Sequence, residues 1–261
     1  MRKGARNARR SIVVFSFIAL AACCGCGDDD EDGTIPDLSV HFADANLEAV
    51  VRVEIDKPTG KIFPADLAGL ETLLAPDQDI DDLGGIQYCV DLKQLDLHNN
   101  SITNLAPLAQ LTDLTALDLE NNSIQNVGPL AGLTNLTSLK LGDNTIEDIT
   151  AIGNLTNLLV LTLYDNRIID LGPLATLSQL TVLRADGNYV VDLSALETLT
   201  NLTNLQLNSN DIEDISALVD NCLAGGLGTG DSVFLEDNPL SSQALSVDIP
   251  YLESNGVDVT F

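Results

Sequence analysis

Two pairs of residues in this chain could hold a metal ion or exchange a proton. Asp96 and His98 lie two residues apart, and Asp118 and Glu120 repeat that spacing 22 residues later. If the pairs stand on adjacent strands, one imidazole and three carboxylates lie a few ångströms apart and could bind a divalent cation. We favour a simpler interpretation, an acidic solvated surface, and expect neither a metal nor a cofactor.

The rest of the sequence offers little for catalysis. The chain has two histidines, and no serine or cysteine stands in a nucleophile motif. A glycine-rich phosphate loop is also missing from the sequence. We therefore predict a binding protein and not an enzyme.

The residues that could carry chemistry belong to a repeat. An asparagine recurs every 22 residues, at Asn100, Asn122, Asn144, Asn166, Asn188 and Asn210. Leucines precede each one at fixed positions, as Leu114, Leu117 and Leu119 do before Asn122. This L-x-x-L-x-L-x-x-N frame is the leucine-rich-repeat signature, which predicts a solenoid.

The frame also predicts the architecture. Each x-L-x-L-x segment becomes a short strand with its leucines inward, so the strands form a parallel β-sheet on the concave side of a right-handed, α/β-type superhelix. The asparagine turns inward and satisfies loop backbone groups. Glycine–proline pairs such as Gly128-Pro129 would break a full α-helix, which leaves 3₁₀ turns and loops on the convex side.

Residues 37–69 precede the regular repeats and predict a helical N-terminal cap. Leu47, Val50 and Val51 follow helical spacing, and Pro64 suits the start of a second short helix. Residues 70–227 hold one degenerate and six regular repeats, with a glycine-rich insertion at 220–231. Residues 228–261 form a closing repeat and cap, with a helix near 243–252 and an alternating Val257, Val259 and Phe261 that would cover the far end.

The N-terminus predicts export. Residues 1–22 combine a basic start with an apolar run too short to span a bilayer, and the run ends in Leu20-Ala21-Ala22-Cys23. This resembles a bacterial lipoprotein signal, which implies that Cys23 is acylated and becomes the mature N-terminus. Secretion with cleavage near Ala22 and no lipid is the alternative. Residues 23–36 read as a flexible acidic tether.

Charge limits the choice of partner. The chain has 39 acidic and 12 basic residues, and five of the basic ones lie in residues 1–22. Seven basic residues then remain against 39 acidic ones, a formal charge of about −32. Such a surface repels nucleic acid and anionic lipid, so the lipid anchor would be the only membrane contact. An unidentified protein with a basic surface is the expected partner.

The chain resembles the internalin-like bacterial leucine-rich-repeat proteins over about residues 40–261. The resemblance rests on the capped 22-residue repeats, on Asn46-Leu47-Glu48 and Pro58-Thr59-Gly60 in the cap, and on Gly85-Ile86-Gln87-Tyr88-Cys89 before the regular repeats. It implies an exported binding protein that uses its concave face. The N-terminal lipid signal and the lack of a C-terminal immunoglobulin-like module depart from the best-known members, so host-cell invasion is not implied.

One part of the predicted concave face differs from its acidic surroundings. Val160 and Tyr164 would lie beside Val182 and Arg184, with Lys140 on the preceding strand. Apolar and aromatic side chains flanked by cations are typical of a protein-binding hot spot. Valine and tyrosine also favour strands for local reasons, so this remains a hypothesis.

The predicted function is therefore a lipid-anchored, extracytoplasmic protein-binding module on the cell membrane or outer membrane, facing the periplasm or the outside. A self-associating structural component of the envelope is the main alternative. A glycan-binding protein would present several aromatic residues on the concave face, where only Tyr164 is expected. A cytosolic phosphatase-regulating repeat protein shares the 22-residue period but has no export signal.

Overall fold

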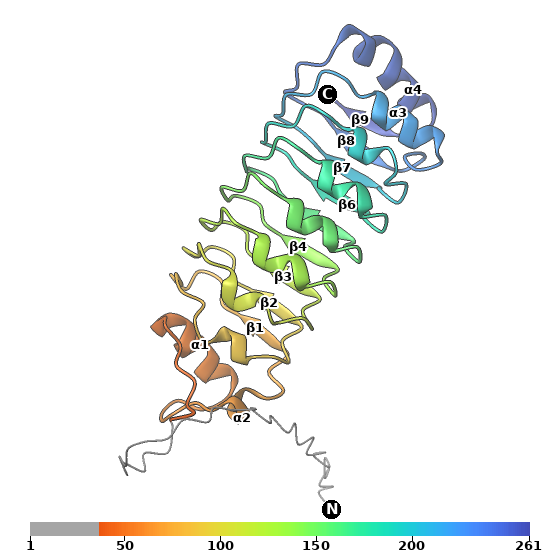
Figure 1. Cartoon of the computed structure of the whole chain (residues 1–261). Coiled ribbons are helices and arrows are strands. Elements are labelled where there is room, and N and C mark those ends of the chain that lie inside the picture. The colour runs from red at the N-terminus through yellow and green to blue at the C-terminus, as the bar shows by residue number, and fades with distance from the viewer. Residues whose placement is uncertain (1–36) are drawn as a thin grey trace, which may run out of the picture. The chain divides into compact units, whose positions relative to one another are not determined.

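A computed structural model describes residues 37–261, and the predictions for Cys23 and for residues 1–36 lie outside this part of the chain. Leu38–Phe261 form one compact unit. In it, one nine-stranded parallel sheet keeps the strand order of the sequence, so the predicted solenoid is confirmed (Figure 1). The strands, each three residues long, are β1 (Thr72–Leu74), β2 (Gln94–Asp96), β3 (Ala116–Asp118), β4 (Ser138–Lys140), β5 (Val160–Thr162), β6 (Val182–Arg184), β7 (Asn204–Gln206), β8 (Ser232–Phe234) and β9 (Asp258–Thr260).

The register of the sheet follows the repeat. Leu95 pairs with Leu117 and Leu117 with Leu139, each the middle residue of its strand. All three are buried, and the first and third residues of each strand point outward. The outer side of the sheet, which we call the concave face, therefore presents columns of side chains spaced by one repeat.

The side opposite the sheet carries 3₁₀ helices, as the glycine–proline pairs predict. They are η1 (Ile86–Tyr88), η2 (Ala106–Leu108), η3 (Gly128–Gly132), η4 (Thr150–Asn154), η5 (Gly172–Thr176) and η6 (Ser194–Leu196). Their leucines and isoleucines pack against the strand leucines in one continuous core.

The cap consists of α1 (Ala45–Glu54) and α2 (Pro64–Leu67), which cover the first strand. Asp44 is the N-cap of α1, since one carboxylate oxygen accepts from the backbone N–H groups of Asn46 and Leu47 at 2.7 and 3.0 Å. Its other oxygen accepts from the N–H of Asp81 at 3.0 Å, which ties the helix to the first repeat. One side chain thus joins the cap to the solenoid.

The sixth regular repeat departs from the prediction. Twenty-eight residues separate Asn210 from Asn238, and the expected irregular insertion begins inside an α-helix, α3 (Ser216–Leu223). This segment contains neither glycine nor proline, but the same holds for η6, so the longer repeat is what gives α3 room for eight residues. Asn221, fully buried, then donates to the carbonyl of Leu196 at 2.7 Å and accepts from the N–H of Leu227 at 2.8 Å.

The far end closes with a π-helical turn η7 (Ala244–Asp248) that runs into α4 (Ile249–Ser254) and then β9. Val257 and Val259 are buried, but Phe261 is 56% exposed, so the predicted covering role of this last aromatic residue is wrong. No helix among residues 37–261 has the length and hydrophobicity needed to cross a membrane.

Asparagine side chains bind successive repeats together. Asn144 donates its amide to the carbonyls of Leu119, Leu141 and Gly142 at 3.0 to 3.1 Å, and its oxygen accepts from the N–H of Ile124 at 2.9 Å. Asn100, Asn122, Asn166, Asn188, Asn210 and Asn238 make the same pattern. Each amide therefore satisfies backbone groups of its own repeat and of the one before.

This arrangement predicts the cost of losing one amide. Asn144→Ala or Asn166→Ala leaves backbone groups of two repeats unpaired in the interior, and we expect the free energy of unfolding to fall by about 1–3 kcal/mol. Gln125→Ala, at an exposed position of the same repeats, should change it by less than about 0.5 kcal/mol. Urea denaturation measures both, and equal midpoints for the two kinds of variant would contradict the ladder's role.

Candidate partner-binding surface

The concave face is built from three outward positions in each repeat. These are the first and third residues of the strand and the residue two positions after the strand ends. Backbone pairing places Asp96 beside Asp118, Asp118 beside Lys140, and Thr162 beside Arg184. Charge and size therefore change from repeat to repeat along columns whose spacing the backbone fixes.

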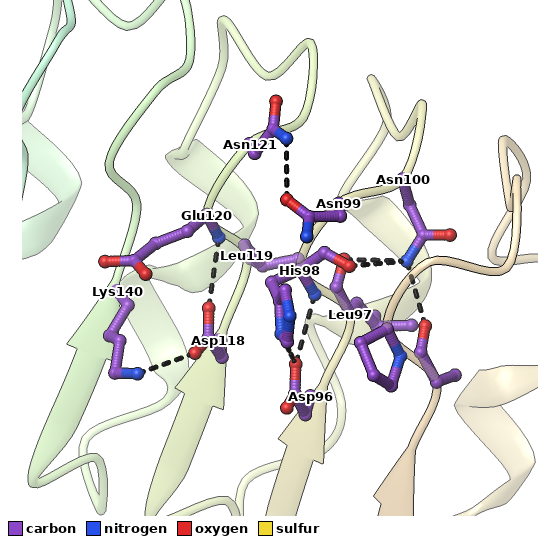
Figure 2. Close-up of polar contacts among 12 residues, drawn as sticks. Asp96, Leu97, His98, Asn99, Asn100, Asp118, Leu119, Glu120, Asn121 and Lys140 are labelled. Carbon is purple, nitrogen blue, oxygen red and sulfur yellow. Dashed lines mark hydrogen bonds and ion pairs between the residues drawn. The ribbon is translucent and has the colours of Figure 1, made fainter.

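The N-terminal end of this face is acidic and internally paired (Figure 2). The Nδ1 atom of His98 lies 2.7 Å from a carboxylate oxygen of Asp96. The ammonium of Lys140 donates to Asp118 at 2.8 Å. Hydrogen bonding to Asp96 raises the pKa of His98 above its ordinary value, with the charges of Asp96 and Asp118 adding to the effect.

Three of the four predicted metal candidates come together. Possible ligand atoms of Asp96, His98 and Asp118 lie within 4.8 Å of one another. Glu120 turns away and accepts from the hydroxyl of Thr162 at 2.7 Å. Since Lys140 already pairs with Asp118, a divalent cation would have to displace that ammonium. These contacts favour the acidic surface over a metal site.

The centre of the face holds a stacked pair. The guanidinium of Arg184 lies over the ring of Tyr164, 4.8 Å from its centroid. Its Nε donates to Gln206 at 2.8 Å, which holds the guanidinium in place. A cation over an aromatic face contributes about 0.5–2 kcal/mol, depending on how dry the site is.

Gly142 makes room for the Tyr164 ring. A Cβ atom at position 142 would lie 2.2 Å from a ring carbon of Tyr164, so only glycine lets the ring lie over the preceding repeat. The ring also comes close to Glu120, and burial together with that carboxylate raises the pKa of Tyr164. Tyr164 could be predicted from the repeat frame, but its need for glycine one repeat earlier could not.

Apolar side chains lie next to the stacked pair. Val160 and Val182 face each other across β5 and β6, as predicted, and both are partly exposed. Leu159, which the prediction omitted, is 42% exposed beside them. Lys140, predicted to belong with these residues, lies on β4 and forms an ion pair with Asp118. It therefore connects the centre of the face to the acidic end.

A shallow hollow lies within the acidic end, over β1 to β4, where Asp96, Asp118 and Lys140 help to line it. It measures about 160 Å³, and its floor includes Leu74, Ala116 and Ser138. Leu74 on β1 is 57% exposed, and it was not among the residues predicted to form a binding surface. The concave face thus offers apolar area at two places.

Every base on the concave face of the described chain has an internal partner. At the concave positions, Lys140 pairs with Asp118, and Arg184 contacts Tyr164 and Gln206. Lys93, one residue before β2, pairs with Glu71 at 2.7 Å. By contrast, Asp143, Asp165 and Asp186 on successive repeats form no ion pair in residues 37–261. Burial raises the pKa of Asp186, and one of its carboxylate oxygens is buried without a hydrogen bond in that part of the chain. The charges of this surface that have no ion-pair partner in the described residues are therefore negative.

Comparison with known proteins places this surface in context. The family model for leucine-rich repeats (two copies) matches residues 112–154, and no curated protein sequence matches the chain. The crystal structure of internalin C2 from Listeria monocytogenes is similar at 36% sequence identity and a TM-score of 0.72, covering 84% of this chain and 94% of that one. The functional domain of InlJ from Listeria monocytogenes covers 84% of this chain and 54% of its own, at 23% identity and a TM-score of 0.58, and supports the fold alone.

The Asp96–His98 contact predicts a pH-dependent contribution to stability. A raised folded-state pKa means that the stabilisation is complete below the unfolded-state pKa and is lost as the pH rises through the folded-state pKa. We expect the melting temperature of the wild type to exceed that of His98→Gln by more at about pH 5 than at about pH 8. NMR titration of the His98 ring should give a lower pKa in Asp96→Asn, and an unchanged pKa in that variant would contradict the assignment.

Proposed function

Because this chain belongs to the internalin family of leucine-rich-repeat proteins, we propose that it binds a protein partner through the centre of its concave face. The Tyr164–Arg184 stack is the observation that carries the proposal. A large aromatic side chain that lies over Gly142 and is covered by a guanidinium loses little conformational freedom when a partner packs on it. Tyrosine and arginine are also the residues that most often dominate binding energy.

The neighbouring residues favour the same place. Val160, Val182 and Leu159 supply apolar area next to the stack, and Lys140 borders it on the side of β4. The carboxylates of Asp143, Asp165 and Asp186 follow the ends of β4, β5 and β6, along one edge of this area, and have no ion pair in the described residues. A partner with lysine or arginine around an apolar centre fits this arrangement, and its approach would be accelerated by the negative field.

Removing the stack tests this site. A partner obtained by pull-down from envelope extracts should bind Tyr164→Ala/Arg184→Ala at least about thirtyfold more weakly than the wild type, which corresponds to about 2 kcal/mol. Both side chains are partly exposed and outside the core, so the melting temperature should stay close to that of the wild type. Calorimetric titration gives the affinity.

Two further variants separate the site from general charge effects. Glu197→Lys changes an exposed charge beside η6, on the side opposite the sheet, and should leave the dissociation rate unchanged. Gly142→Ala keeps Tyr164 and Arg184 but displaces the ring, so it should also weaken binding. Equal affinity of the double variant and the wild type would place the partner elsewhere, with the acidic end at Asp96–Glu120 as the next candidate.

We further propose that the protein is exported and held at a membrane by a lipid on Cys23. The support is in the sequence: a basic start, a short apolar run, and cysteine directly after Leu20-Ala21-Ala22. The acidic residues 28–32 that follow would keep the repeat domain away from an anionic surface.

Cys23→Ser should move the protein from the membrane fraction to the soluble fraction and abolish incorporation of a labelled fatty acid. Cys24→Ser is the matched control, because it removes the adjacent thiol and keeps the acylated position. The measurement is a fatty-acid label together with detergent phase partitioning. The lipid proposal is wrong if the two variants partition and label alike.

A further inference from the structure

A second surface lies outside the sheet, on the segments that follow the ladder asparagines. Equivalent residues occur there in all six regular repeats, so the residue in one repeat can be compared with those in the other five. Three residues after the asparagine, the side chains are Thr103, Gln125, Glu147, Ile169, Val191 and Glu213. The apolar ones occur in two neighbouring repeats and in no other regular repeat.

The same two repeats carry a further apolar side chain at this place. At the position one residue after the asparagine, the repeat that begins at Leu180 has Tyr189. The other five regular repeats have a polar or charged residue there. Ile169 is 64% exposed, Tyr189 54% and Val191 53%. We call these three residues the lateral patch.

Backbone contacts place the patch residues side by side. Asp170 and Asp192 form an isolated parallel β-bridge, so Ile169 and Val191, which directly precede them, are neighbours. The N–H of Tyr189 donates to the carbonyl of Ile168 at 2.9 Å, which puts the tyrosine next to Ile169. The three side chains therefore form one contiguous apolar area.

The fold does not require this area. Thr103 and Gln125 occupy the same position in other repeats with the same ladder contacts, so a polar residue serves there equally well. β-branched residues suit extended segments, but that preference would also be met by threonine. Single exposed apolar residues are ordinary, whereas a group of them in a chain this acidic is typical of an interaction site.

Charged residues surround the patch and define what would fit it. Glu147 lies on one side, and Asp211 and Glu213 on the other. The N–H of Asp211 donates to the carbonyl of Val190 at 3.0 Å, which brings this carboxylate to the border of the patch. Arg167 is the one basic residue on these segments, and its guanidinium lies 3.9 Å from a carboxylate oxygen of Glu147. An apolar centre between carboxylates complements an apolar centre between lysines or arginines.

We propose that the lateral patch is a second docking surface, and that it takes a protein segment with aliphatic or aromatic side chains flanked by basic residues. This surface does not depend on the concave site, because none of its residues lies in a strand of the sheet. A second copy of the chain fits less well, since it would bring its own carboxylates to the same border.

The test uses a displayed library of random 12-residue peptides, selected on the full-length protein and counter-selected on Ile169→Thr/Val191→Gln. These substitutions introduce the residues found at positions 103 and 125, so the variant should fold with an unchanged melting temperature. We expect enriched peptides with apolar centres between lysines or arginines. In fluorescence anisotropy they should bind the variant at least about tenfold more weakly than the wild type.

Thr103→Ala/Gln125→Ala changes the same positions in two other repeats and should bind the peptides as the wild type does. Tyr164→Ala/Arg184→Ala should also bind them normally, which separates this surface from the concave site. The proposal is overturned if no peptide distinguishes the wild type from the patch variant, or if the enriched peptides are acidic. It is also overturned if sedimentation shows a dimer that Ile169→Thr/Val191→Gln abolishes, because the occupant would then be a second copy.

Discussion

The hydrogen bonds of the buried asparagine side chains are the constraint on which the rest of the structure depends. Each repeat turns sharply after its strand, and that turn leaves backbone N–H and C=O groups in the interior, where unpaired groups are costly. One asparagine amide supplies both donors and an acceptor, as Asn166 does for Leu141, Leu163 and Ile146. Because the side chain reaches the previous repeat, it also fixes the register between repeats. The spacing of every surface column follows from this contact.

The register explains how much could be predicted from the sequence. Asparagine and leucine positions determine which residues share a column, so the neighbours Val160 and Val182, or Asp96 and Asp118, follow from counting. Counting does not determine where a side chain turns. Glu120 lies in the expected column yet bonds to Thr162, two repeats further along, and so leaves the expected metal cluster. Rotamers depend on the sizes of neighbouring residues, which the repeat frame does not encode.

Two other features were missed for the same kind of reason. The role of Gly142 becomes visible only when the Tyr164 ring is seen over it, although a glycine at a position held by larger residues in the other regular repeats was a usable signal. Helix α3 arises in the one regular repeat that is longer than 22 residues, so periodicity gave no guide there. Departures from the repeat, and not the repeat itself, are where side-chain packing decides the structure.

Both proposed binding surfaces lie on such departures from the repeat. The Tyr164–Arg184 stack, with Val160 and Val182, lies on the two repeats that begin at Leu158 and Leu180. The lateral patch of Ile169, Tyr189 and Val191 lies on those same two repeats, beyond their ladder asparagines. Asn166 and Asn188 therefore support both surfaces, one on each side of the turn. In a stack where each repeat contacts only its neighbours, a change in this pair disturbs the adjacent repeats and little beyond them. The charge of the remaining acidic repeats acts on both proposed surfaces from a distance, because an exposed charge is felt over about 10 Å at physiological salt.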